Sequence, residues 1–231
     1  MWLYFLLLAF SFAGPLLLSF DKKVAFYKFW KYFFPVNSIV LVLFITVDVF
    51  FTKSGFWGFN PSYHLNTLIL HLPLEEWMFF IVIPYASVFI HYCLMAYFPK
   101  LLFSRNLTHI ISALFVVVAV LGIVFYNQRA YTLYASLLVI ASMAVTYAYQ
   151  IKILQLFYIS FIIILIPFTI TNGILTGTGI EGEVVWYNNS ENVHLRILTI
   201  PIEDFFYGFS LILLNLTGME YLRNRKKIDL Q

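Results

Sequence analysis

Seven long apolar runs constrain this chain more than any motif, because a bilayer accepts only segments that satisfy their own backbone hydrogen bonds. The runs cover residues 1–20, 36–51, 74–98, 107–126, 130–150, 152–172 and 202–222. About 17 to 25 apolar residues suffice for a helix that spans the hydrocarbon core. With 62% hydrophobic, 20% aromatic and 11% charged residues, the composition is too apolar for a soluble domain. We therefore predict an all-α, polytopic membrane protein with about seven transmembrane helices.

The first run could instead be a signal peptide that is removed after export. It has no basic segment at its start, and no convincing small-residue cleavage site precedes Asp21. We expect it to be retained as a helix. The single cysteine, Cys93, excludes an intrachain disulfide and any multi-cysteine metal site.

Basic residues between the runs predict the orientation, because Lys and Arg gather in cytoplasmic loops. Eleven fall on one side: Lys22, Lys23, Lys28, Lys31, Lys100, Arg105, Lys152, Arg223, Arg225, Lys226 and Lys227. The other side has Lys53, Arg129 and Arg196. We expect the N-terminus outside, the C-terminus in the cytoplasm and, as location, a bacterial plasma membrane. The net charge of +3 is then a juxtamembrane bias and indicates no nucleic-acid partner.

A short acidic motif occurs twice, each time at the head of an apolar run. Pro73-Leu-Glu-Glu-Trp-Met-Phe-Phe and Pro201-Ile-Glu-Asp-Phe-Phe-Tyr-Gly are 128 positions apart. Any helix start favours proline and acids, so one copy alone indicates little more than a helix. Carboxylates at a membrane edge cost free energy unless they are paired, solvated or protonated. Two such pairs in matched positions therefore favour a functional interpretation.

The repeat extends beyond the motif. Trp57 lies sixteen residues before Pro73 and Trp186 fifteen before Pro201, which predicts a one-residue slip between the copies. Asn172 takes the place of Asp48, the only charge inside its run. We predict two parallel three-helix repeats, residues 1–104 and 130–231, joined by a spacer helix at 105–129. Parallel repeats put the acids of both motifs at the same membrane face.

Two other patterns carry less weight. His64 and His71 could share a helical face, but no carboxylate completes a ligand spacing, so we expect no metal site. Gly177-Thr-Gly-Ile-Glu-Gly182 matches the dinucleotide fingerprint literally. That fingerprint works only between a strand and a helix, whereas here it follows a membrane helix.

The chain resembles the integral-membrane lycopene cyclases, which occur as heterodimers in some bacteria and as fused chains elsewhere. The resemblance rests on the two acidic motifs, on the Asp48 stretch followed by Trp57-Gly-Phe-Asn-Pro, and on Asn172-Gly-Ile-Leu-Thr-Gly, and it covers nearly the whole chain as a two-unit fusion. It implies acid/base work for Glu75, Glu76, Glu203 and Asp204. We expect supporting or substrate-binding roles for Asp48, Asn172, Trp57, Asn60, Trp186 and Asn188. Asn172 in place of Asp48 leaves open whether both units are catalytic.

The chemistry that the resemblance implies needs a proton donor and a proton acceptor, and no cofactor. An acid protonates the terminal alkene of a linear carotenoid, the next double bond attacks the cation, and a base removes a proton. Desolvation and a neighbouring like charge favour a protonated acid, while the helix dipole opposes it. The expected product of lycopene is β-carotene, and the expected partners are the carotenoid and the bilayer. Homo-oligomers and complexes with other carotenoid enzymes stay open.

Two other functions remain as alternatives. A small transporter or lipid-binding scaffold could use the same acids to bind a proton or a cation. Against it, the acids start helices near one face, and no pair of broken helices is evident. A prenyltransferase would need aspartate-rich magnesium sites, which the sequence lacks.

Overall fold

A computed structural model describes residues 2–228, with side chains to residue 225, and it confirms the all-α prediction. The α-helices in this range are α1 (Leu3–Leu18), α2 (Trp30–Lys53), α3 (Leu74–Tyr97), α4 (Arg105–Tyr126), α5 (Ala130–Tyr149), α6 (Lys152–Leu175) and α7 (Ile202–Ile228). Six of them are long and apolar enough to cross a membrane. The shorter helix, α1, has 16 residues and therefore measures about 24 Å.

The second helix begins earlier than the apolar run that predicted it. A 3₁₀ turn, η1 (Phe26–Phe29), leads directly into α2 at Trp30, so Pro35 lies inside the helix. A proline this close to the start removes only an early backbone hydrogen bond. The aromatic residues before it pack inward: the ring of Phe33 lies 6.4 Å from that of Phe26 and 5.4 Å from that of Tyr85. This buried contact explains why the helix begins before the apolar run.

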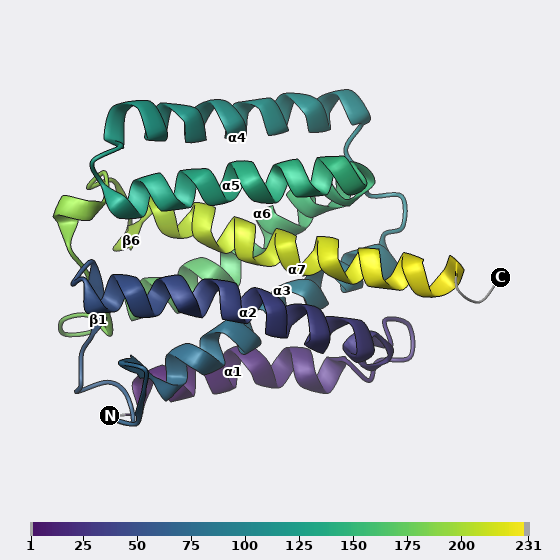
Figure 1. Ribbon diagram of the computed structural model, residues 1–231. Helices are drawn as coiled ribbons and strands as arrows, with labels where there is room; N and C mark the ends of the chain where they lie inside the picture. Colours follow the sequence, from purple (N-terminus) through teal and green to yellow (C-terminus); the bar gives the residue numbers. More distant parts are fainter. Residues whose placement is uncertain (1, 229–231) are drawn as a thin grey trace.

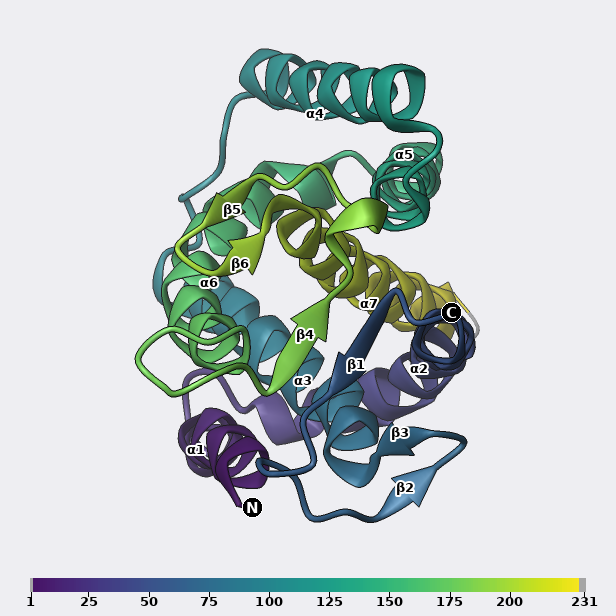
Figure 2. The same ribbon diagram turned by 90° about the vertical axis from the view of Figure 1, so that its left-hand side faces the viewer.

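The helices form a bundle in which the two repeats interlock (Figure 1). Within each repeat the first helix packs on the third, α1 on α3 and α5 on α7. Between repeats the second helix of one packs on the third helix of the other, α2 on α7 and α6 on α3. The spacer α4 lies outside this arrangement, against α5 (Figure 2). Each third helix therefore packs against helices of both repeats.

Short strands, which the sequence did not predict, cover one end of the bundle. They are β1 (Trp57–Phe59), β2 (Leu68–Ile69), β3 (Leu72–Pro73), β4 (Val185–Tyr187), β5 (Arg196–Ile197) and β6 (Ile200–Pro201), with a 3₁₀ turn η2 (Asn189–Glu191) after β4. Hairpins β2–β3 and β5–β6 lead into α3 and α7, so each motif proline ends a strand one residue before its helix. Strands β1 and β4 pair antiparallel and join the two repeats (Figure 2).

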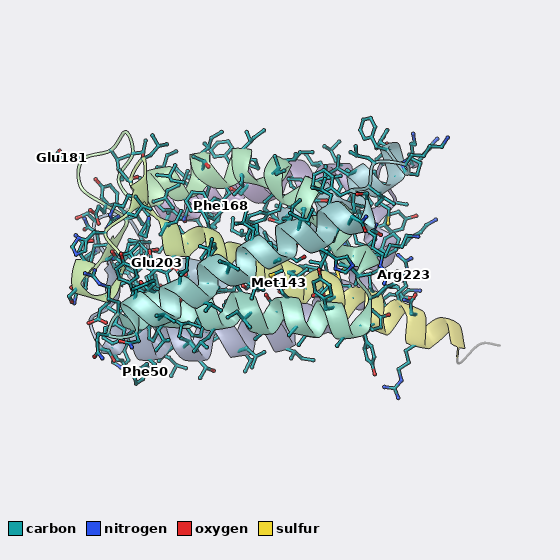
Figure 3. The ribbon with its side chains drawn as sticks, turned by 90° about the horizontal axis from the view of Figure 1, so that it is seen from above. Phe50, Met143, Phe168, Glu181, Glu203 and Arg223 are labelled. Atoms are coloured by element: carbon teal, nitrogen blue, oxygen red, sulfur yellow. The ribbon has the colours of Figure 1, made fainter. Side chains whose placement is uncertain are left out.

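The two ends of the bundle differ in charge. The adjacent acids of the two motifs and the N-terminal residues lie at the strand end, together with Lys53, Arg129 and Arg196. Figure 3 shows Glu203 and Arg223 near opposite ends of the bundle. The remaining basic residues lie at the Arg223 end, except that the side chains of Lys226 and Lys227 fall outside the described part. The repeats are thus parallel, as predicted, while their boundaries remain a prediction.

Candidate active site

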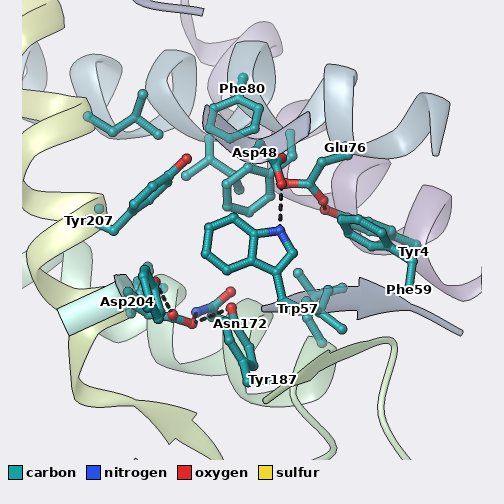
Figure 4. A pocket seen from close by; sticks show the side chains of 18 of the residues that line it. Tyr4, Asp48, Trp57, Phe59, Glu76, Phe80, Asn172, Tyr187, Asp204 and Tyr207 are labelled. Carbon is teal, nitrogen blue, oxygen red and sulfur yellow. Dashed lines mark hydrogen bonds between the residues drawn. The ribbon is translucent and has the colours of Figure 1, made fainter. Parts of the chain in front are cut away.

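The first turns of α3 and α7 each direct one carboxyl group into a shared cavity. Glu76 and Asp204, the second acid of each pair, line the cavity, whereas Glu75 and Glu203 do not (Figure 4). Adjacent residues of a helix point about 100° apart, and here that rotation turns Glu75 and Glu203 away from the cavity. Each motif therefore has one inward acid, which lines the cavity, and one outward acid, which does not. The inward acids are Glu76 and Asp204, and the outward acids are Glu75 and Glu203.

The outward acids hold the approach loops. One carboxylate oxygen of Glu75 accepts a hydrogen bond from the backbone N–H of Leu65 at 2.7 Å, and Glu203 does the same with Val193 at 2.8 Å. Glu203 also accepts from the hydroxyl of Thr132 at 2.6 Å. The other oxygen of each outward acid is buried without a hydrogen-bond partner. These contacts position the inward acids and do not reach the cavity.

In the first repeat, two carboxyl groups meet at the cavity wall. The carboxyl groups of Asp48 and Glu76 lie side by side at the cavity wall (Figure 4). Like charges this close, in a buried place, disfavour ionisation of both groups at once. Tyr4 donates its hydroxyl to Glu76 at 2.5 Å, and the indole N–H of Trp57 donates to Asp48 at 2.6 Å. We call these two residues the acid pair (Asp48 and Glu76), and two adjacent carboxyl groups of this kind are suited to retain one proton.

The second repeat surrounds its inward acid with donors instead. Asp204 accepts from the hydroxyl of Tyr131 at 2.5 Å, from the hydroxyl of Tyr187 at 3.0 Å and from the amide of Asn172 at 2.8 Å. Burial, and next the negative charge of Asp204, raise the pKa of Tyr187 well above its usual value, so its phenol remains a donor. Three donors fill most of the roughly four acceptor positions of an ionised carboxylate. This half of the site is equipped to take up a proton.

Aromatic faces lie between the two carboxyl clusters. The indole of Trp57 is 5.0 Å from the ring of Tyr131 and 6.1 Å from that of Tyr187, and Figure 4 shows it between Asp48 and Asp204. Tyr207 also lines the cavity, and its buried hydroxyl has no hydrogen-bond partner. Electron-rich ring faces attract a cation, most strongly where water is excluded. The cavity can therefore stabilise a positive charge formed between a proton donor and an acceptor.

The two tryptophans of the predicted repeat do not occupy equivalent positions, which corrects the predicted one-residue slip. In the β1–β4 ribbon, Trp57 pairs with Tyr187 and Gly58 pairs with Trp186. The 128-residue offset of the acidic motifs, applied to this ribbon, matches Trp186 to Gly58 and Tyr187 to Phe59. Trp186 is 41% exposed and covers Gly58, where an added Cβ would lie 2.4 Å from its ring. Trp57 reaches the cavity and Trp186 covers the outside of the ribbon.

The predicted asparagines fall into two groups. Asn172 lines the cavity, as described above. Asn60 and Asn188 cap turns outside it: their side-chain oxygens accept from the backbone N–H groups of Ser62 and Ser190, each at 3.0 Å. Their matched contacts support the 128-residue offset and indicate a role in loop shape.

Sequence reasoning missed the tyrosines that donate to the inward acids. Tyr4 and Tyr131 are 127 residues apart and make the same contact in each half, with Glu76 and Asp204. Extending the repeat to the starts of the first and fifth apolar runs would have paired them. Tyr187 had no such signal, because Phe59 is its counterpart in the first repeat.

The glycine-rich segment at 177–182 connects α6 to β4, so the order of elements is the reverse of a dinucleotide fold. Gly177 has φ +111°, and an added Cβ there would lie 2.8 Å from the carbonyl oxygen of Gly182. The glycines therefore serve a tight loop. Within residues 2–228, no group of three or more His, Cys, Asp and Glu side chains could hold a metal ion.

Comparison with known protein families decides the assignment. A family model described as lycopene cyclase matches residues 1–94 and 128–222. The chain belongs to the lycopene cyclase family. Searches of curated proteins and of solved structures gave no match. The cyclase is thus a membrane-integral enzyme of carotenoid biosynthesis with an isomerase-type reaction, and its two matched blocks leave out α4.

Proposed function

We propose that this cyclase closes β-rings at the ends of lycopene, giving β-carotene, by proton transfer between its own carboxyl groups. The observation that carries the proposal is the opposition, across one aromatic cavity, of two adjacent carboxyl groups, Asp48 and Glu76, and a carboxylate surrounded by donors, Asp204. Donor and acceptor on opposite walls are what a cyclisation through a carbocation requires. No electrons are exchanged, so the reaction needs neither flavin nor nicotinamide.

The steps follow the geometry of the site. The acid pair gives its proton to the terminal alkene carbon and leaves a tertiary cation against Trp57 and Tyr207. The neighbouring double bond attacks the cation, a C–C bond closes the ring, and the positive charge moves to a ring carbon. Asp204 then removes a proton from the adjacent carbon, and a new double bond forms. The product is an isomer of the substrate, and the proton returns from Asp204 to the acid pair through exchange with water.

Each residue around the carboxyls contributes to this division of roles. The indole of Trp57 orients Asp48 while its ring faces the cavity. Tyr4 fixes the Glu76 carboxyl by a hydrogen bond. Glu75 and Glu203 act through the loops and not on the substrate.

The test is expression in cells that accumulate lycopene, followed by pigment analysis and by an assay of membranes in heavy water. β-Carotene should form without added nucleotide, and each ring should carry one deuterium at the former alkene terminus. Unchanged pigment would favour a transporter or scaffold. Rings without deuterium would eliminate a carboxyl as the proton source.

For orientation, the proposal is an outward N-terminus and a cytoplasmic C-terminus in a bacterial plasma membrane. The unequal charge of the two ends supports it. Reporters fused to each terminus distinguish the two orientations. A C-terminal reporter that is active only outside the cell would reverse the topology and put the site at the cytoplasmic face.

A further inference from the structure

A second apolar space adjoins the active-site cavity on the lipid-facing side of the bundle. It is a groove of about 260 Å³ between α1, α3 and α6, and its wall is almost entirely apolar. Phe10, at its outer rim, is 77% exposed. The polar Ser11 and Thr171 in the wall hydrogen-bond to each other at 3.3 Å, so they offer little to a polar ligand. The groove therefore opens toward hydrocarbon and suits an apolar molecule dissolved in the bilayer.

The groove and the cavity share part of their walls. Phe79, Ile83, Phe168 and Asn172 line both spaces. Asn172 donates to Asp204, so the groove begins where the acceptor side of the site ends. This continuity gives the groove a direct route to the reacting groups.

The cavity by itself is too small for the reaction. Its volume is about 60 Å³, whereas an engineered protein cavity that binds one benzene molecule measures about 150 Å³. A six-membered ring with methyl groups cannot form there unless the wall toward the groove moves. Phe168 forms part of that wall, because its ring lines both spaces and lies beside Gly208, where no Cβ stands in its way.

Two prolines make the groove walls adaptable. Pro15 lies inside α1 and Pro167 inside α6, and both line the groove. Each removes a backbone hydrogen bond from its helix, which weakens the helix locally. These two breaks fall in the two helices that flank α3 along the groove.

We propose that the groove between α1, α3 and α6 is the lateral entrance and binding site for the linear polyene. The unreacted part of the polyene lies in the groove while one end reaches Glu76 and Asp204, so this proposal rests on the proposed function. Ile90 lies fourteen residues beyond Glu76 on α3, so the groove extends about 21 Å from the acids into the bilayer. An extended, rigid, apolar chain matches this shape, and only one end of the molecule reacts per visit.

The experiment fills the groove without touching the reacting groups. Ala86→Trp projects into the groove, and Ala86 does not line the cavity. Ala113→Trp is the matched control, because Ala113 is exposed on α4, away from the groove. Both changes are made in the active chain and in a Glu76→Gln background, which keeps the substrate linear. Ile90→Trp, deeper in the groove, is a second test in case Ala86→Trp does not fold.

Linear polyene that copurifies with folded protein is measured in the Glu76→Gln background, and ring formation is measured in the active one. Ala86→Trp should lower both at least fivefold, and Ala113→Trp should change neither. Equal polyene content in the two variants, or phospholipid acyl chains in place of polyene, would overturn the groove proposal. If the otherwise unmodified chain forms no rings but Ala86→Trp still removes bound polyene, the groove stands and the catalytic proposal fails.

Discussion

The two halves of the active site share a backbone plan and differ in which side chain faces the inward carboxyl group. In the first half Glu76 faces a second acid, Asp48, whereas in the second half Asp204 faces the amide of Asn172. A second carboxyl retains a proton, while an amide donor satisfies a negative charge. A different residue beside the inward acid, Asp48 in one half and Asn172 in the other, thus turns a duplicated site into a donor and an acceptor. A repeat of this kind can produce two roles without producing two sites.

The largest expected effect comes from removing each inward acid separately. Glu76→Gln should reduce ring formation by at least about 100-fold, because no proton reaches the alkene. Asp204→Asn should reduce it similarly, yet the cation still forms and can lose the added proton again. In heavy water, only Asp204→Asn should therefore put deuterium into recovered linear substrate. Deuterium in the Glu76→Gln substrate would reverse the two roles.

Making the halves alike is expected to have the next largest effect. Asn172→Asp sets a second carboxyl beside Asp204, and the new pair would retain a proton at neutral pH. Ring formation should fall about 10- to 100-fold, since the acceptor is then already protonated. Raising the pH should recover part of the rate by removing that proton. Asn172→Gln keeps the amide and serves as the control, and a pH-independent loss in Asn172→Asp would contradict the explanation.

Substitutions at the two tryptophans compare the cavity side of the β1–β4 ribbon with its exposed side. Trp57→Phe keeps a ring in the cavity but loses the N–H donated to Asp48, and we expect about a tenfold lower rate. Trp186→Phe is the matched change on the exposed side of the ribbon and should stay within about twofold. Both rates are measured on membranes with equal amounts of enzyme. Equal losses would mean that the ribbon matters as a structural element and that the indole has no separate role.

The smallest effect is expected at the outward acids. Glu75→Gln and Glu203→Gln keep a carbonyl oxygen for the N–H groups of Leu65 and Val193, so the rate should fall no more than about threefold. Alanine at either position leaves a buried donor unpaired, costs about 1–3 kcal/mol and should lower the melting temperature in detergent. A loss in Glu75→Gln as large as that in Glu76→Gln would restore the outward acids to the chemistry.

The sequence was sufficient for the helices and for the position of the acids, because apolar runs and charges depend on local composition. It could not select Glu76 over Glu75, since a shift of a single residue in the helix start changes which acid faces inward. It also missed the hairpins before α3 and α7. The first turn uses the left-handed conformation at Leu70 and His71 and the second at Leu198, all without glycine, so the usual turn signal is absent.

Local sequence patterns could not predict which distant residues contact one another in the site. The pairing of Trp57 with Tyr187 depends on how the two repeats meet, and no residue near either strand specifies it. Asp48 was found because a charge inside an apolar run is rare. Tyr131 and Tyr207 were not, because aromatic residues are common throughout this membrane chain.

The interlocking of the repeats also determines when the enzyme can exist during its synthesis. Ribosomes deliver helices in order, so α3 enters the membrane long before α7, and β1 waits for a strand about 128 residues downstream. Until then Asp48 and Glu76 have no opposite wall and face lipid, and Glu76 cannot yet react productively with a polyene. The acceptor helix is the last to arrive. A chain that stops short of α7 is therefore inactive, and it also leaves a carboxyl pair uncovered in the bilayer, a state that membrane quality control can recognise.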